Sequence, residues 1–254
     1  HLLQFGWQIY ESGIVVLPRT QVVWESTGLL DRSTARLTDM RNIRIFGVPM
    51  DLGQRRRGVD MGPSALRYAG LNEQLRKVGH TVHDNGNLTV PLPENEPPDP
   101  STGSGRARHL HSIASVCGDV YTNSLTCLEH NETAIFLGGD HSISIGTVSA
   151  MDTHGGNVGV IWVDAHGDFN TPEISPSGNV HGMALASLFG RGPSELTDIG
   201  RPGAKLKASE AVIIGARDLD SDERSALIDC GILVLTMRDV DEMGMAAAAH
   251  PALE

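Results

Sequence analysis

The sequence contains few cysteines, an excess of acidic over basic residues and no long apolar run. Its three cysteines, Cys117, Cys127 and Cys230, are too few and too scattered for a disulfide framework or a thiolate zinc site. We expect them to be buried apolar residues in a reducing cytoplasm. The formal net charge of −11 argues against nucleic acid and anionic membranes as partners. No stretch approaches the roughly 20 apolar residues that cross a bilayer, so the composition predicts a cytoplasmic globular protein.

The beginning of the chain differs in pattern from the rest. Its first methionine is Met40, and residues 1–39 show no sustained helical or strand period. We interpret residues 1–39 as a non-native or disordered extension, and we expect residues 40–254 to form the folded domain. The alternative is a genuine N-terminal extension. At the other end, residues 237–254 have the pattern of a helix that begins shortly before the sequence stops.

Short β-branched runs alternate along the chain with amphipathic segments of helical length. The predicted strands are 43–48, 134–137, 158–163, 211–214 and 231–235. The predicted helices are 62–78, 107–130, 143–153, 183–189, 221–228 and 237–243. Apolar strands that alternate with helices indicate a parallel sheet covered on both faces. We therefore expect one doubly wound α/β domain, with residues 85–105, rich in proline and acid, as a surface loop.

A polar motif follows the apolar run 159–163, where the predicted sheet would place a ligand site. Asp164, His166 and Asp168 occupy every second position after this run. In an extended chain alternate side chains point the same way, so we expect these three to converge. Two carboxylates this close would repel each other and lose hydration, and a metal cation would remove both costs.

Two further motifs bring polar residues to the same edge of the predicted sheet. In FLGGDHSISIG, two glycines permit close backbone approach, and His141 follows at the strand-to-helix corner. In SPSGNVHGM, a glycine-containing loop that leads into a helix carries Ser177, Asn179 and His181. Taken singly, such residues are more often helix caps, turn residues or packing residues. The pair Ser177 and His181 does not lie in a nucleophile elbow, so a nucleophilic triad is not indicated.

The combination of motifs favours a site for divalent metal ions. His141, Asp164, His166 and Asp168 form a mixed nitrogen and oxygen ligand set. Such a set suits manganese or another borderline-hard cation better than the metals that prefer thiolates. Two ions that share one carboxylate fit the spacing, with Asp164 as the bridge, because three ligands from one segment can reach adjacent ions.

The motifs GGDHS, DAHGD and SGNVHGM, in this order, resemble those of the ureohydrolase superfamily and, within it, the arginases. The similarity runs from Met40 to the last residue and includes IFGVPMDLGQRRRGVDMGPSALRYAGL, which is similar to bacterial arginases. The resemblance implies a three-layer α/β/α fold with two manganese ions per complete site. It also implies hydrolysis of the guanidinium group of L-arginine to L-ornithine and urea by a metal-bridging hydroxide, in a homo-oligomer that is a trimer or a hexamer.

The resemblance assigns a role to each candidate residue. His141 and Asp168 would bind one ion and His166 the other, with Asp164 between them. His181 matches the histidine that delivers a proton to the departing amine, a task suited to an imidazole. The residues that match contacts to the substrate's α-carboxylate are Asn170, Ser177 and Asn179. The residues in GARDLDSDE that match contacts to its α-ammonium group are Asp220 and Glu223.

One family motif does not occur in the 254 residues. This motif, Ser-x-Asp-x-Asp-x-x-Asp-Pro, supplies a second bridging aspartate and a further ligand, and it lies C-terminal to the region where this sequence stops. A later glutamate that faces the substrate guanidinium is also absent. We therefore expect a chain truncated at its C-terminus, with an incomplete sheet, which is inactive as it stands.

Two other functions stay open from the sequence. An agmatinase, or another guanidino- or formimino-hydrolase of the same superfamily, would share the metal ligands. Agmatine has no α-carboxylate, however, so the SPSGN loop would have nothing to hold, and this loop together with Asp220 favours arginine. The other alternative is a non-catalytic ureohydrolase-like binding protein that keeps the fold and lacks the second metal.

Overall fold

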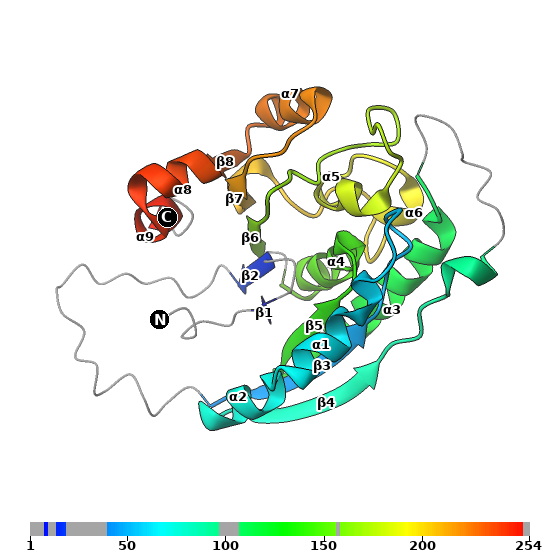
Figure 1. Ribbon diagram of the computed structural model, residues 1–254, viewed down its shortest axis with the longest axis vertical. Helices are drawn as coiled ribbons and strands as arrows, with labels where there is room; N and C mark the ends of the chain where they lie inside the picture. Colours follow the sequence, from blue (N-terminus) through cyan, green and yellow to red (C-terminus); the bar gives the residue numbers. More distant parts are fainter. Residues whose placement is uncertain (1–7, 10–13, 19–39, 97–106, 156–157, 251–254) are drawn as a thin grey trace.

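The computed structural model describes residues 8–9, 14–18, 40–96, 107–155 and 158–250, and these residues contain two β-sheets (Figure 1). The smaller sheet has the strand order β4-β3-β5 and the larger has the order β1-β2-β6-β7-β8. The strands are β1 (Gln8–Ile9), β2 (Ile14–Pro18), β3 (Asn42–Val48), β4 (Thr81–Asn87), β5 (Thr133–Gly138), β6 (Val158–Val163), β7 (Ala211–Ala216) and β8 (Leu233–Thr236).

Helices follow most of the strands. The α-helices are α1 (Gly62–Tyr68), α2 (Leu71–Lys77), α3 (Leu110–Glu129), α4 (Ser144–Gly155), α5 (Ala184–Leu188), α6 (Ser194–Thr197), α7 (Ser221–Cys230), α8 (Met237–Met243) and α9 (Met245–Ala249). Short 3₁₀ helices include η3 (Pro93–Asn95), η4 (His141–Ile143) and η5 (Val180–Met183). Among the described residues, no helix has both the length and the apolar character needed to cross a membrane.

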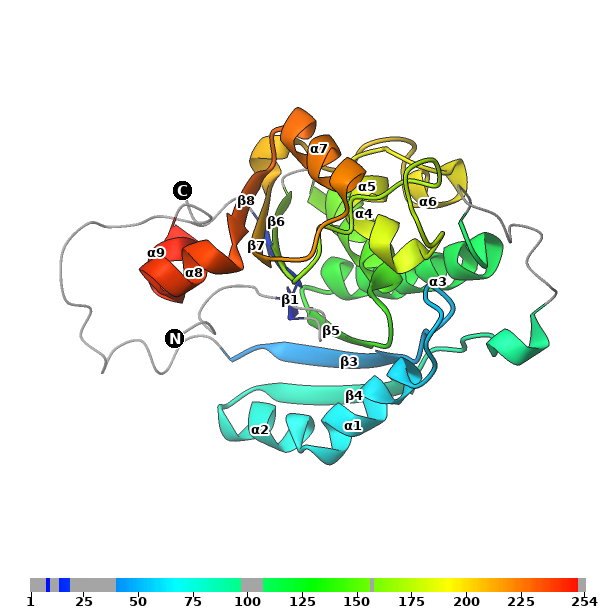
Figure 2. The ribbon, with the colours of Figure 1, turned by 45° about the horizontal axis from the view of Figure 1, so that its top comes forward.

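The smaller sheet is covered on both faces, as the sequence predicts. Alternate residues of its strands point to opposite sides. Ile43, Ile45 and Ile135 face α1 and α2 and form a core with their leucines. Phe46 and Phe136, whose rings stack with centroids 5.0 Å apart, face the main core with α3 and α4. Figure 2 shows these two helix pairs on opposite sides of β3, so this part of the molecule has three layers.

The prediction of parallel pairing is confirmed for the strands that the sequence identified. β3 pairs in parallel with β4 and β5, and β7 pairs in parallel with β6 and β8. Two elements of the smaller sheet and its helices differ from the prediction. The helix expected over 62–78 is broken into α1 and α2 at Gly70, which has a φ of 85°. Strand β4 was not predicted because it is an edge strand on which only Val82 is buried, and so it has no apolar pattern.

The expected loop over 85–105 and the expected N-terminal extension are partly described. β4 continues to Asn87 and η3 follows, whereas 97–106 lie outside the described residues. In the N-terminal region, β2 pairs antiparallel with β6 and β1 with β2, so residues 8–9 and 14–18 differ from the expected disorder. These strands lie between β6 and β5 in Figure 1. The assignment of Met40 as the initiator stays a prediction.

Helices α3 and α4 pack at a distance that a glycine sets. A Cβ atom at Gly146 in α4 would lie 2.3 Å from the backbone oxygen of Cys117 in α3. A Cβ atom at Gly118, also in α3, would meet no atom within 4 Å. Alanine at Gly118 therefore changes only helix propensity, whereas alanine at Gly146 also changes the packing of α3 against α4.

We predict opposite effects of alanine at these two positions. Gly118→Ala should stabilise the fold by about 0.5–1 kcal/mol, because alanine loses less backbone entropy in a helix than glycine. Gly146→Ala should lower the free energy of unfolding by about 1–3 kcal/mol, because the two backbones must move apart. Urea unfolding followed by circular dichroism measures both. Equal stabilisation by the two substitutions would show that α3 and α4 do not pack as described.

Candidate metal centre and substrate site

The loop after β5 places His141 at the carboxyl edge of the sheet. A Cβ atom at Gly139 would lie 1.9 Å from the backbone oxygen of Met50, so only glycine fits where these two segments cross. The next residue, Asp140, caps η4 by accepting a hydrogen bond from the Ser142 amide at 3.0 Å. This turn buries His141, whose side chain is 5% exposed.

The loop after β6 brings Asp164 and Asp168 to the same place. The alternation of the three residues predicts an extended chain here, but β6 ends at Val163 and the following residues bend. Asp168 has a φ of 47°, in the left-handed region. Backbone hydrogen bonds from Asp164 to Ile214 and from Arg217 to Ala165, at 3.1 and 2.8 Å, hold this loop against the end of β7. The two carboxylates therefore converge because the chain turns between them, and the alternation argument was wrong.

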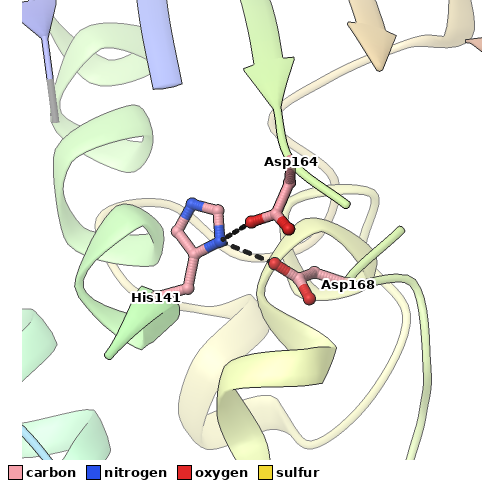
Figure 3. Close-up of side chains that lie close together, drawn as sticks. All are labelled: His141, Asp164 and Asp168. Atoms are coloured by element: carbon pink, nitrogen blue, oxygen red, sulfur yellow. Dashed lines mark ion pairs between the residues drawn. The ribbon is translucent and has the colours of Figure 1, made fainter. Parts of the chain in front are cut away.

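Figure 3 shows the side chains of His141, Asp164 and Asp168 facing one another. The Nδ1 atom of His141 lies 2.6 Å from Asp168 Oδ2 and 3.2 Å from Asp164 Oδ2. One possible ligand atom from each residue lies within 4.8 Å of the others. These three residues are thus close enough to share one cation.

His166 lies outside this group but next to Asp164. Its side chain is 54% exposed, and its Nδ1 is 3.1 Å from Asp164 Oδ1. The other oxygen of Asp164 faces His141, so this carboxylate lies between two histidines. On its far side, His166 faces Asp218 at 3.8 Å, an exposed carboxylate that the sequence interpretation did not single out.

The buried atoms of the cluster fit a divalent cation. Among the described residues, neither His141 Nδ1 nor Asp168 Oδ2 has a hydrogen-bond partner, although they lie 2.6 Å apart as an ion pair. Their contact has the distance of a hydrogen bond without its geometry. Burial lowers the pKa of His141, but the nearby carboxylates of Asp164 and Asp168 raise it by more, so that the pKa is about 9. The two carboxylates thus favour a positive charge at this position, which a proton or a metal ion can supply.

Asn170 and Asp220, two of the expected substrate contacts, lie together beside the cluster. The side-chain amide of Asn170 donates to Asp220 Oδ2 at 3.2 Å. Its carbonyl oxygen is buried and has no hydrogen-bond partner among the described residues. A substrate carboxylate would therefore compete with Asp220 for the Asn170 donor, while the free carbonyl can accept from an ammonium group.

The loop that carries Ser177, Asn179 and His181 lies against the other strand ends. The Ser177 hydroxyl accepts a hydrogen bond from the Asn179 amide at 3.2 Å, and η5 begins directly after Asn179. The side-chain oxygen of Asn179 is buried without a hydrogen-bond partner in the described structure. The backbone amide of His181 donates to Gly53 at 3.2 Å, and Gly182 accepts from the Asn170 amide at 3.1 Å. The bond from Asn170 joins this loop to the segment after β6, and the bond to Gly53 joins it to the segment after β3.

Glu223, the second residue expected to contact the α-ammonium group, lies in the first turn of α7. Its side chain is buried, and its Oε1 accepts from the Phe169 amide at 2.9 Å. Its Oε2 accepts from the Asp220 amide at 3.3 Å. Burial raises the pKa of Glu223 to about 7, against the opposing effect of the Phe169 amide.

No role was predicted for Gly53, which links the turn of His141 to His181. The Gly53 amide donates to Asp140 Oδ2 at 2.8 Å, while its carbonyl accepts from His181. A Cβ atom at Gly53 would lie 2.5 Å from the Ser142 hydroxyl. The signal that could have identified Gly53 is its position five residues after β3, in the loop at the carboxyl end of that strand.

The fold and the cluster define an α/β protein with a His/Asp/Asp group that could hold a metal ion at the carboxyl ends of parallel strands. The model of the Arginase family matches residues 41–254. The arginase of Brevibacillus brevis is 45% identical over 220 residues, which cover 84% of this chain and 70% of that protein. The chain belongs to the arginase family.

Solved structures agree with this assignment. The native arginase of Bacillus caldovelox superposes with a TM-score of 0.76 at 41% identity, over 84% of this chain and 70% of that one. The arginase of Entamoeba histolytica in complex with L-ornithine superposes with a TM-score of 0.73 at 31% identity, over 84% of this chain and 71% of that one. The arrangement of strands and helices described above is therefore the arginase fold.

We predict that the 254-residue chain binds Mn²⁺ through Asp168. Asp168→Asn should weaken binding at least about tenfold, because even the groups that support a ligand contribute that much to metal affinity. Asp229→Asn, a matched change at an exposed position of α7, should leave affinity unchanged. Isothermal titration calorimetry measures both. The same dissociation constant for the two variants would contradict the site.

Proposed function

We propose that this site hydrolyses the guanidinium group of L-arginine to L-ornithine and urea with two manganese ions. The observation that carries the proposal is the position of Asp164, which presents one oxygen to the buried His141 and the other to the exposed His166. A carboxylate between two imidazoles is suited to bridging two cations. Membership of the arginase family supports the same reaction.

The residues present would hold the two ions unequally. His141, Asp164 and Asp168 provide three ligands for the first ion, whereas His166 and the shared Asp164 provide two for the second. When bound, such a pair of cations lowers the pKa of water, so that hydroxide is available near neutral pH. Because the second ion has fewer ligands, we expect it to bind more weakly.

The protein's own groups would orient the substrate and move its proton. Ser177 and Asn179 carry donors suited to the α-carboxylate of arginine. Asp220 is an exposed carboxylate suited to the α-ammonium group. His181 is half-buried in η5, which packs beside the η4 turn that carries His141, and its imidazole would deliver a proton to the departing amine. Assembly into a trimer or hexamer, and a cytoplasmic location, stay predictions.

The substrate can be tested through Asn179. The test uses a chimera in which the C-terminal part of a bacterial arginase, carrying the Ser-x-Asp-x-Asp-x-x-Asp-Pro motif, follows residue 254. We predict that Asn179→Ala lowers kcat/KM for arginine by about tenfold to a hundredfold, the effect of about 1.5–3 kcal/mol for a charge-assisted hydrogen bond. Turnover of agmatine, which has no α-carboxylate, should change far less. Asn123→Ala on α3 is the control.

Three outcomes would contradict the proposal in distinguishable ways. Equal losses on arginine and agmatine would show that Asn179 does not bind the carboxylate. Faster turnover of agmatine than of arginine by the unsubstituted chimera would indicate an agmatinase. Manganese binding without hydrolysis of either substrate would indicate a binding protein. The 254-residue chain itself should release urea far more slowly than the chimera, because its second ion has only two ligands.

A further inference from the structure

The buried side chain of Glu223 connects two loops of the site. The residue lies in the first turn of α7, and its side chain is 3% exposed. One carboxylate oxygen accepts from the amide of Phe169, which lies between Asp168 and Asn170. The other accepts from the amide of Asp220, where α7 begins. A single buried carboxylate therefore contacts the backbone next to a proposed metal ligand and next to a proposed substrate contact.

The loop after β6 is shaped to receive this carboxylate. A Cβ atom at Gly167 would lie 2.8 Å from the Leu227 side chain and 3.1 Å from the Glu223 carboxyl group. Glycine at this position thus lets α7 approach the loop closely enough for the bond to Phe169. Asp168, the residue between Gly167 and Phe169, has a φ of 47°. A left-handed conformation at a non-glycine residue is unfavourable and needs support from its surroundings.

The position of the Glu223 carboxylate argues against direct contact with the substrate. Both of its oxygens accept backbone hydrogen bonds, and almost none of the side chain is accessible. Each oxygen could accept a further hydrogen bond, but with 3% of Glu223 exposed an ammonium group could reach it only if α7 or the loop after β6 moved. The neighbouring Asp220 is exposed and can meet an ammonium group without such a movement.

We propose that Glu223 is a positioning residue that fixes the left-handed turn at Asp168 and the start of α7 relative to each other. It acts on the metal site through the Phe169 amide and on the substrate site through the Asp220 amide. This proposal rests on the proposed function only in its kinetic test, which needs hydrolysis of arginine. The effect of Glu223 on the loop after β6 and on metal binding applies whatever the substrate is.

The test compares two substitutions at Glu223 with a matched control in the full 254-residue chain. Glu223→Gln keeps the shape but leaves one oxygen to accept from two amides. Glu223→Asp keeps the charge and can still cap α7 at Asp220, but it is too short to reach Phe169 as well. The control is Asp152→Asn, which removes a buried carboxylate paired with Arg201 at the far end of α4 from His141.

Two measurements on the chain alone decide the inference. Hydrogen exchange of the Phe169 amide, followed by NMR without metal, should accelerate in both Glu223 variants and not in Asp152→Asn. The dissociation constant for Mn²⁺ should rise about tenfold or more in both Glu223 variants, as for other groups that orient metal ligands. Asp152→Asn should keep its Mn²⁺ affinity even where its Tm falls. Wild-type affinity in Glu223→Asp would overturn the inference.

Kinetics of the chimera separate positioning from substrate contact. Positioning predicts that Glu223→Gln lowers kcat for arginine and for 5-guanidinopentanoate, which lacks the α-ammonium group, and that any rise in KM for arginine from a displaced Asp220 accompanies weaker Mn²⁺ binding. A rise in KM confined to arginine, with unchanged Mn²⁺ affinity, would overturn the inference in favour of direct contact. If the unsubstituted chimera releases no urea, the proposed function fails, and the exchange and metal-binding results still decide the role of Glu223.

Discussion

The arrangement of the site depends on the contact between one buried imidazole and two carboxylates. His141 comes from the loop after β5, and Asp164 and Asp168 come from the loop after β6. Separately, each of these groups would lose hydration on burial without compensation. Together they form a cluster of alternating charge that favours a cation or a proton at its centre. The hydrogen bonds of the neighbouring loops keep the three side chains in contact.

Backbone hydrogen bonds, rather than side-chain packing alone, hold the cluster. Asp140 fixes the turn of His141 and binds the Gly53 amide, and Gly53 in turn accepts from His181. On the other side, Glu223 binds the amide after Asp168. Three acidic or small residues outside the ligand set thus connect every polar segment of the site. Such supporting contacts fix ligand orientation in metal sites generally.

The sequence predicted the parts of the fold whose signal is local. The apolar runs of β3, β5, β6 and β7 and the motif residues at their ends could be recognised because buried parallel strands have a continuous apolar pattern. β8 is an edge strand but could be recognised because residues 233–235 are all apolar. Strand β4, also an edge strand, could not, because Val82 is its only apolar side chain. Among the candidate site residues, the positions of Glu223 and His166 could not be predicted. Whether an acidic or imidazole side chain points into the protein or away from it depends on turns such as the one at Asp168, which spacing does not reveal.

The central claim is that His141, Asp164 and Asp168 are ligands of one cation. The most direct measurement is an anomalous difference map at the manganese absorption edge, from crystals of the chain grown with Mn²⁺. This interpretation predicts a peak in contact with His141 Nδ1 and with one oxygen from each aspartate. A second, weaker peak between Asp164 and His166 would mark the less completely held ion. A map with no peak at the three-residue cluster, in crystals that bind manganese elsewhere, would contradict the account.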